Sequence, residues 1–323
     1  MGRSGGFAAV LVATVCLWPG PHPRADEWPS RPVKIVVAFA PGGSADQFGR
    51  LLATELSAAL KQQFFVENRP GNSGAIGSAQ VARAEPDGYT LLIGGSGPHL
   101  TGPAINPNIG YEPLKDFTHI AMIGADSYAW AANPVLGAKS IAELVALAKS
   151  RKDPITSSSP GPGSLGHLLI EQFKRKAGID IQHVPAPNSG VTDVLGNHIS
   201  MTLTAMMTVG EQVRAGKLLA LAVTSTERNP VFKGIPTFAE QGYPDVRGDT
   251  WFWLCGPRNL PPDVVGKLSQ ETRRIVKSPK VQEHFQKLAI LTKDLDPAAV
   301  QTFIAEEYAF WAPLAKAAGL KVQ

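Results

Sequence analysis

The sequence predicts an α/β protein made of two units, each of alternating strands and helices. The chain has 323 residues, which is enough for two domains of ordinary size. Hydrophobic residues make up 44% and charged residues 18%, a composition that supports a packed core and excludes a disordered or collagen-like chain. Short β-branched runs alternate with amphipathic segments along the chain, which is the pattern of a layered α/β fold.

The first 25 residues are predicted to be a secretory signal peptide. A weakly basic start precedes the apolar stretch Phe7 to Trp18, and the small residue Ala25 precedes an acidic pair. The apolar stretch is too short to span a bilayer. The alternative is an apolar N-terminal strand or helix that is retained. Export would place the mature protein in the periplasm.

Removal of the signal peptide changes the charge and the cysteine count. It takes Arg3 and Arg24 from the 31 basic residues and leaves the 27 acidic residues, so the mature chain is nearly neutral. With no basic run or RNP-like motif, nucleic acid is not an expected partner. Cys16 also leaves, so Cys255 cannot form an internal disulfide. It lies in the apolar run 251–255 and is predicted to be a buried thiol.

The first unit opens with three strands joined by glycine-rich loops and helices. Residues 33–39 form a continuous β-branched run, as expected of a strand buried on both faces of a parallel sheet. Apolar residues at helical spacing follow over 44–60. Strands are expected at 64–67 and 89–93, with a Gly/Pro loop and a helix at 75–84 between them.

The middle and end of the chain repeat this order. Capping boxes at Ser140-x-x-Glu143 and Thr208-x-x-Glu211 predict two helix starts, and a further helix is expected over 164–177. The apolar stripe of the last helix is interpreted as core packing rather than an aromatic ligand box. The remaining strands are expected at 119–124, 130–132, 154–158, 181–184, 199–204, 218–224 and 251–255, and the closing helices near 262–277, 279–288 and 297–318.

Two loops are predicted to form a shared anion site. The segments 41–46 and 157–167 each lead from a strand into a helix and place Gly and Ser where the helix begins. Glycine lets backbone N–H groups turn toward a ligand, and a helix N-terminus adds partial positive charge and free donors. Serine hydroxyls can donate as well. The alternative is that both loops are tight turns with Ser as N-cap.

Other chemistry is less well supported by the sequence. Gly161-x-Gly163-x-x-Gly166 matches the dinucleotide fingerprint by letter, but flanking prolines remove the N–H donors that a pyrophosphate needs. The segment 94–98 fails the nucleophile-elbow pattern at its last position. A Ser-His-Asp triad stays open. None of the seven histidines forms an HxH or HxxxH pair, so neither a metal nor another cofactor is expected.

Several motifs, in order, resemble one family. They are VKIVVAFAPGGSAD, VENRPGNSGAIG, EPDGYTLLIGGSGPH, SLGHLLIEQFKRKAGIDIQHVP, VRAGKLLALAVTSTERNP and IPTFAEQGYPDV. The chain resembles the extracytoplasmic substrate-binding proteins of tripartite tricarboxylate transporters, the Bug family, over essentially its whole mature length. The resemblance implies a periplasmic-binding-protein-like clamshell (type II-like), each domain a mostly parallel sheet flanked by helices. Domain 1 would hold 26–124 plus 248–323 and domain 2 the inserted 125–247, with hinge crossings near 124–130 and 247–256.

The resemblance also implies a function and a set of ligand-binding residues. A monomer without enzymatic activity would bind a small organic acid, a mono-, di- or tricarboxylate, aromatic and amino acids included. It would deliver this acid to membrane transporter subunits. The implied ligand-binding residues, including positions picked out above, are Pro41, Gly42, Gly43, Ser44, Asp46, Ser96, His99, Ser157, Ser159, Gly161, Gly163, Ser164, His167, Asp193 and Thr204.

This sequence departs from the family pattern near the expected cleft. The segment 183–193 is two residues shorter, with Ala186 and Pro187 in place of Tyr and Lys. Tyr128 and Trp130 replace small aliphatic residues, so the cleft wall is predicted to suit an aromatic or larger carboxylate. Two alternative functions stay open. One is a ligand-dependent sensor partner of a signalling receptor, and the other is an exported serine hydrolase that uses Ser44, Ser96 or Ser164 with a histidine.

Overall fold

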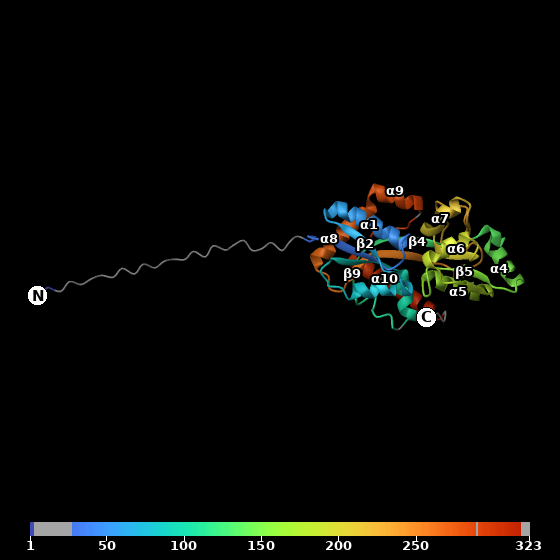
Figure 1. Ribbon diagram of the computed structural model, residues 1–323, viewed down its shortest axis with the longest axis horizontal. Coiled ribbons are helices and arrows are strands. Elements are labelled where there is room, and N and C mark those ends of the chain that lie inside the picture. The colour runs from blue at the N-terminus through green and yellow to red at the C-terminus, as the bar shows by residue number, and fades with distance from the viewer. Residues whose placement is uncertain (3–27, 107, 289, 318–323) are drawn as a thin grey trace.

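The computed structural model describes residues 1–2, 28–106, 108–288 and 290–317. Almost all of the predicted signal peptide therefore lies outside the described residues. Within the described part, no helix has both the length and the apolar character needed to cross a membrane. Figure 1 shows two lobes side by side, one with both ends of the described chain and one built from its middle.

The first lobe is built on a mixed sheet. β1 (Val33–Val37) lies between β2 (Phe64–Asn68) and β3 (Thr90–Gly95), and both pairings are parallel. β9 (Asp249–Pro257) pairs antiparallel with β3 and with β4 (Phe117–Ala132). The sheet begins with the parallel strands that the apolar run 33–39 predicts, and its last two strands lead toward the second lobe.

The second lobe continues from the same long strand. From Tyr128 onward, β4 pairs antiparallel with β7 (Met201–Ala205) and β8 (Leu219–Val223). β5 (Ile155–Ser158) pairs in parallel with β7 and with β6 (Ile181–His183). The strand order is β2-β1-β3-β9-β4-β7-β5-β6, with β8 also paired to β4. One strand thus belongs to the sheets of both lobes.

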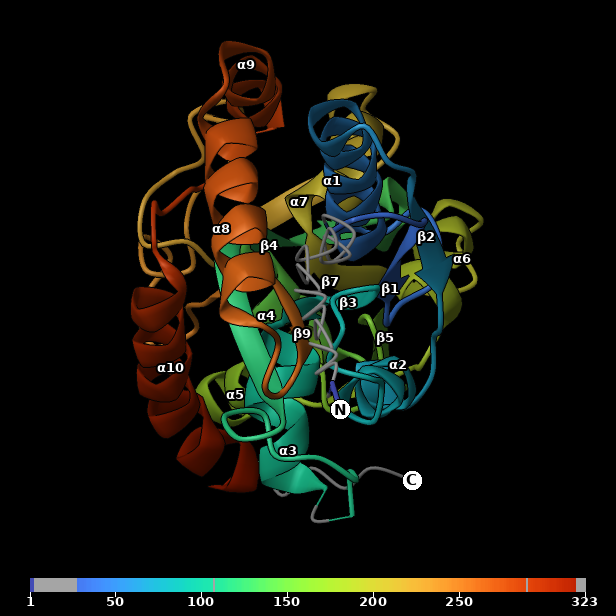
Figure 2. The same ribbon diagram turned by 90° about the vertical axis from the view of Figure 1, so that its left-hand side faces the viewer.

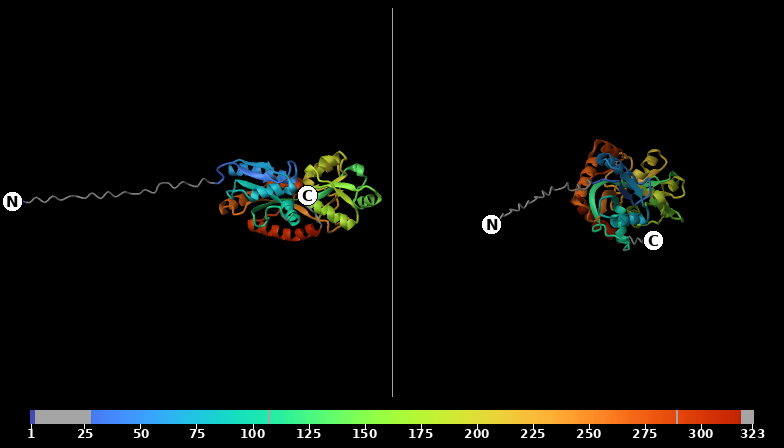
Figure 3. Two further views of the ribbon diagram at one scale, coloured as in Figure 1. Left: turned by 60° about the horizontal axis from the view of Figure 1, so that its bottom comes forward. Right: turned by 60° about the vertical axis from the view of Figure 1, so that its left-hand side comes forward.

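Helices cover both faces of the first sheet, as Figures 2 and 3 show. Alternating side chains of the strands separate two cores. Val33, Ile35 and Leu254 pack toward α1, α8 and α9, whereas Val36 and Trp253 pack toward the side of α2 and α10. The helices of this lobe are α1 (Ser44–Leu60), α2 (Ala75–Ala82), α3 (Gly102–Ile105), α8 (Pro262–Lys277), α9 (Pro279–Leu288) and α10 (Pro297–Ala317), with short turns η1 (Asn72–Gly74) and η2 (Gly97–Thr101).

The second lobe has its own aromatic centre. Trp130 of β4 is fully buried, and its ring lies 4.8 Å from that of Phe173 and 5.7 Å from that of Phe238. The helices of this lobe are α4 (Ile141–Ser150), α5 (Leu165–Ala177), α6 (Val191–Leu195) and α7 (Met206–Arg214), with turns η3 (Pro134–Leu136) and η4 (Pro187–Gly190). The protein therefore has the expected α/β two-domain clamshell fold, with mixed sheets.

Two sequence predictions of elements are wrong, each for a physical reason. The strands expected at 119–124 and 130–132 are one strand, β4, because the polar residues between them keep their ladder pairs with β9, down to Ser127 opposite Asp249. The helix predicted from the Thr208 capping box begins earlier, at Met206. A carboxylate distant in sequence, Asp126, accepts the Met207 N–H at 2.8 Å and takes the capping role.

Other local predictions are confirmed. The Ser140 hydroxyl accepts the Glu143 N–H at 3.1 Å and begins α4. Cys255 is a free, fully buried thiol. The limits of the domains, 26–124 with 248–323 and 125–247, remain a prediction. β4 and β9 run antiparallel through both expected hinge crossings.

Candidate ligand-binding site

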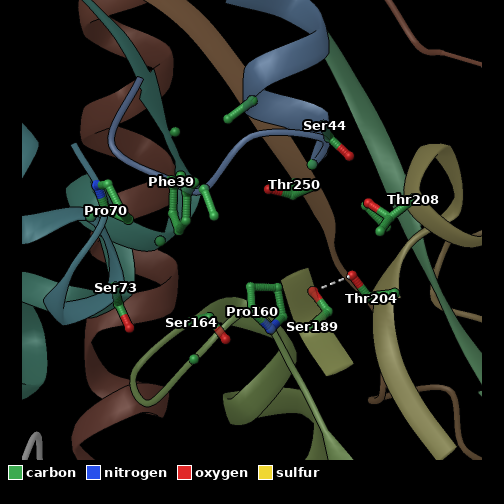
Figure 4. A pocket seen from close by; sticks show the side chains of 18 of the residues that line it. Phe39, Ser44, Pro70, Ser73, Pro160, Ser164, Ser189, Thr204, Thr208 and Thr250 are labelled. Carbon is green, nitrogen blue, oxygen red and sulfur yellow. Dashed lines mark hydrogen bonds between the residues drawn. The ribbon is translucent and has the colours of Figure 1, made fainter. Parts of the chain in front are cut away.

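A cavity of about 610 Å³ opens between the two lobes, within the size range of small-molecule sites. Figure 4 shows side chains of both lobes facing it. Among the residues that the structure describes, no lysine, arginine, histidine or acidic residue lines it. The lining residues are Phe39, Ala40, Gly43, Ser44, Ala45, Pro70, Gly71, Asn72, Ser73, Gly74, Gly95, Ser96, Gly97, Tyr128, Pro160, Gly161, Pro162, Ser164, Pro185, Ala186, Ser189, Thr204, Ala205, Thr208, Thr250 and Phe252.

One wall of the cavity is the N-terminus of α1. Gly43 is its N-cap residue, and no side chain caps the helix there. The first N–H groups of a helix have no partner within the helix. Because Gly43, Ser44 and Ala45 line the cavity, the partial positive charge and the free N–H donors of this helix end lie at the cavity wall, an arrangement that can bind an anion.

Asp46 holds this loop from behind. Its buried carboxylate accepts the Gly42 N–H at 3.0 Å, the Arg50 Nε–H at 2.9 Å and the Asn68 amide at 2.9 Å. Burial raises the pKa of Asp46, but hydrogen bonds from Arg50, Gly42 and Asn68 outweigh it, so the pKa is lowered. Asp46 is therefore ionised and fixes the turn at Gly42, whose φ is 91°. It does not line the cavity.

The second glycine–serine loop, residues 157–167, uses many of its hydrogen-bonding groups within the loop itself. Ser164 is the N-cap residue of α5, and its hydroxyl accepts the His167 N–H at 3.2 Å, which confirms the capping interpretation for this loop. The Gly163 N–H donates to His167 Nδ1 at 3.2 Å. The Ser159 Oγ lies 3.3 Å from the Ser164 Oγ and 2.8 Å from His183 Nε2. This loop thus offers fewer free donors than α1, although Gly161 and Ser164 line the cavity.

Two histidines support that loop as a stacked pair. The rings of His167 and His183 lie 3.9 Å apart and are inclined by 13°. Burial lowers the pKa of each to about 4, and the positive Lys174 acts in the same direction on both. Both imidazoles are therefore neutral near pH 7; His167 accepts a hydrogen bond from the Gly163 N–H, and His183 shares one with the Ser159 hydroxyl.

Acidification is expected to destabilise the protein through this pair. In the unfolded chain each histidine is protonated with the ordinary pKa of 6.5. In the folded chain the pKa of each is about 4, so protonation occurs only at lower pH. The stabilisation is fully present above pH 6.5 and falls toward pH 4, by at most ~1.4 kcal/mol per pH unit for each histidine. In thermal melts from pH 6.5 to 4, His183→Gln should lose less Tm than wild type. The exposed control His284→Gln should follow wild type, and a His183→Gln slope equal to wild type would contradict the assignment.

The two lobes touch beside the cavity. Ser73 on the loop after β2 donates its hydroxyl to the Pro162 carbonyl. Thr101 at the end of η2 donates to the Gly163 carbonyl at 2.6 Å. The described conformation therefore has the glycine–serine loop of one lobe bound to the other lobe.

Comparison with known proteins settles the family. Residues 48–320 match the model of the tripartite tricarboxylate transporter family receptor. The chain belongs to this family. Protein BugT of Bordetella pertussis is 34% identical over 302 residues, 93% of each chain. The structure of the periplasmic binding protein BugD superposes with a TM-score of 0.86 at 31% identity, covering 92% of this chain and 100% of that one. The R. palustris protein Rpa4515 with adipate gives 0.86 at 31%, covering 91% and 99%.

The structure places the expected site residues of this receptor in three groups. Those that line the cavity are Gly43, Ser44, Ser96, Gly161, Ser164 and Thr204. Those that brace its two loops by hydrogen bonds are Gly42, Asp46, Ser159, Gly163 and His167. Those placed elsewhere are Pro41, His99, Ser157 and Asp193. Which of these residues contact a ligand remains a prediction.

His99 lies in the core of the first lobe. It is fully buried, with its ring centroid 4.6 Å from Phe117 and 5.4 Å from Trp253. Its ring nitrogens, those of His119 and the Cys255 thiol form a buried group whose ligand atoms lie within 4.8 Å of one another. We interpret the group as packed neutral rings, since burial lowers the pKa of both histidines.

Sequence reasoning missed several parts of the lining, among them Ser189 and Thr208 of the second lobe and two parts of the first lobe. The first is the loop 70–74, which joins β2 to α2 and has positive φ at Gly71 (135°) and Gly74 (92°). It has the same strand, glycine-rich loop and helix order as the two loops that were selected. The second part is Thr250 and Phe252 on β9, whose contact with the cavity depends on the pairing of β9 with β3 and β4.

The three serines considered for hydrolysis have other partners. The Ser44 hydroxyl donates to Asp126 at 3.3 Å, and Ser96 accepts the Trp251 N–H at 2.9 Å. Ser164 is a helix cap. Among the described residues, none of the three bonds to a histidine ring. The serine that does, Ser159, is fully buried and does not line the cavity.

Proposed function

We propose that this protein binds a small carboxylate between its lobes in the periplasm and delivers it to the membrane subunits of a tripartite tricarboxylate-type transporter. The observation that carries the proposal is the uncapped N-terminus of α1, which opens into a cavity between the lobes. Adipate in the related R. palustris structure supports a carboxylate ligand. The predicted signal peptide and the periplasmic relative BugD support the location. In this account the protein is a binding protein, not an enzyme.

The lining favours a carboxylate with an apolar body. Phe39, Tyr128 and Phe252 contribute aromatic surface, prolines add apolar surface, and the described lining contains no cationic side chain. One carboxylate is matched by backbone donors at α1. Further charges in the middle of the ligand would lose water without gaining an ion-pair partner. Aliphatic or aromatic acids therefore suit the cavity better than a compact tricarboxylate.

A thermal-shift and calorimetry panel tests the proposal. The panel contains adipate, benzoate, glutamate, malate and citrate. Because a ligand that binds only the folded state raises Tm, we expect adipate or benzoate to raise Tm by several degrees and citrate to have less effect. Absence of a shift and of binding heat for every acid would contradict carboxylate capture.

A gene deletion tests the transport role. Deletion should abolish uptake of the acid that binds. Intact uptake with a lost transcriptional response would instead favour the sensor alternative.

Thr101→Val is expected to weaken binding more than folding. Valine keeps the shape of threonine but leaves the buried Gly163 carbonyl without its donor when the lobes are in contact. Such a loss costs about 1–3 kcal/mol, or about 5- to 150-fold in affinity. Calorimetry with the acid found above should show this increase in Kd. Thr302→Val, which removes an exposed helix hydroxyl on α10, should bind like wild type. An unchanged Kd for Thr101→Val would show that the contact does not contribute to closure.

A further inference from the structure

A buried carboxylate lies directly behind the anion-binding end of the cavity. Asp126 is on β4, in the stretch that passes between the lobes, and it is fully buried. Its Oδ2 accepts the Ser44 hydroxyl at 3.3 Å and the Met207 N–H at 2.8 Å. Its Oδ1 has no hydrogen-bond partner among the described residues. Ser44 lines the cavity, so only one hydroxyl group separates Asp126 from a ligand bound there.

Asp126 joins the two lobes at this point. Ser44 is the first residue of α1 in the first lobe, and Met207 lies in the first turn of α7 in the second. An ionised Asp126 uses the only proton of the Ser44 hydroxyl. That hydroxyl then offers lone pairs, not a donor, to the cavity. This orientation is unfavourable for a carboxylate ligand.

Among the described residues, no cation acts directly on Asp126, but Lys293 acts on its neighbour Asp249 from a segment bridged to β4 by Leu291 opposite Ala125. The titratable group that acts on Asp126 is Asp249 on β9, and Asp126 in turn adds to the burial that raises the pKa of Tyr128 on β4. On α1, the pair of Asp46 with Arg50 is turned toward β2. On α7, Glu211 is paired with Arg214 on the exposed side. A ligand carboxylate would thus add a second negative charge to a cavity whose described lining contains no positive side chain.

Two carboxylates that share one site do not both stay ionised. Burial raises the pKa of Asp126 to about 7, and Asp249 adds to this effect, although the hydrogen bonds from Met207 and Ser44 oppose it. A ligand carboxylate at Ser44 raises the pKa further.

We propose that Asp126 takes up one proton from solvent when a carboxylate binds beside Ser44. Asp126 thereby makes carboxylate binding tighter at lower pH, where it already carries this proton. The proton converts Asp126 to a neutral acid and frees the Ser44 hydroxyl to donate to the ligand. Asp126 acts through Ser44 and is therefore a positioning residue. This inference rests on the proposed function, carboxylate binding at α1.

The test measures proton uptake on binding. The probe is adipate, or the panel acid with the largest Tm shift at pH 5.5. Calorimetry at pH 8 in two buffers of different ionisation enthalpy should give nearly one proton taken up per wild-type protein, and nearly none at pH 5.5. The wild-type Kd should rise about tenfold per pH unit above pH 7 and stay level below pH 6.

Asp126→Asn separates charge from shape. Asparagine keeps an acceptor for Met207 and stays neutral, so uptake should vanish and Kd should be level from pH 5.5 to 8. At pH 8 the variant should bind about tenfold more tightly than wild type. Its Tm at pH 8 should equal or exceed wild type, because a buried charge is removed. The control Asp153→Asn, an exposed carboxylate of the second lobe, should behave as wild type.

The outcomes distinguish this inference from the function on which it rests. Binding without proton uptake, or a pH-dependent Kd that persists in Asp126→Asn, overturns the role of Asp126 and leaves carboxylate capture standing. Failure of wild type and Asp126→Asn to bind any panel acid at pH 5.5 overturns both.

Discussion

Gly43→Val should abolish carboxylate binding while the protein stays folded. Gly43 has φ −80° and ψ 173°, an extended conformation that valine adopts readily. A Cβ at this position would have only the Ala40 carbonyl oxygen nearby, at 4.0 Å. The valine methyl groups would instead occupy the cavity in front of the Ser44 and Ala45 N–H groups. Losing these donors to the anion should weaken binding by at least about 100-fold.

The measurement is calorimetry with the panel acid that binds wild type, beside a thermal melt without ligand. We expect no measurable heat for Gly43→Val and a Tm close to wild type. Gly234→Val is the matched control, since its Cβ meets nothing within 4 Å and Gly234 lies outside the lining. Wild-type affinity in Gly43→Val would show that the ligand does not bind at α1.

Gly166→Ala should destabilise the second lobe and disturb the site together. A Cβ at Gly166 would lie 2.8 Å from the Leu203 carbonyl oxygen and 2.9 Å from Tyr128 Cε1. The first turn of α5 must then move away from β7, and the glycine–serine loop moves with it. Overpacking of this kind costs about 1–3 kcal/mol, which lowers Tm by about 2–4 °C per kcal/mol.

A second glycine-to-alanine change gives the opposite sign. Gly266 lies inside α8, is exposed, and has nothing within 4 Å of an added Cβ. Gly266→Ala should stabilise the protein by about 0.5–1 kcal/mol through helix propensity.

Thermal melts of both variants beside wild type are the measurement. Equal Tm values for Gly166→Ala and wild type would mean that α5 and β7 are less tightly packed than the structure indicates.

Local sequence signals predicted the elements that hold the site. The β-branched run 33–39 and the glycines after it predict a strand, a turn and a helix start from residues that are close in sequence. Ser140 caps α4 as its spacing to Glu143 predicts, and Ser164 caps α5 as the alternative interpretation of its loop states. These features depend on neighbours in sequence, so one sequence is enough to find them.

Features that depend on contacts between residues far apart in the sequence could not be predicted from local patterns. Asp126 and Ser127 look like an interruption of a strand, yet pairing with β9 carries β4 through them. Asp126 also replaces the local cap predicted for α7. His99 follows a glycine-rich strand end, as a ligand-binding residue would, but η2 turns it into the core. Tertiary contacts determine the structure at each of these positions, and the local sequence pattern does not predict those contacts.

A crystal structure of the protein with its tightest panel acid tests the central claim most directly. We predict a ligand carboxylate between the lobes, with its oxygens within hydrogen-bond distance of the Ser44 and Ala45 N–H groups and its apolar body against Phe39, Tyr128 or Phe252. A carboxylate bound elsewhere, with the N-terminus of α1 still facing solvent, would contradict the account.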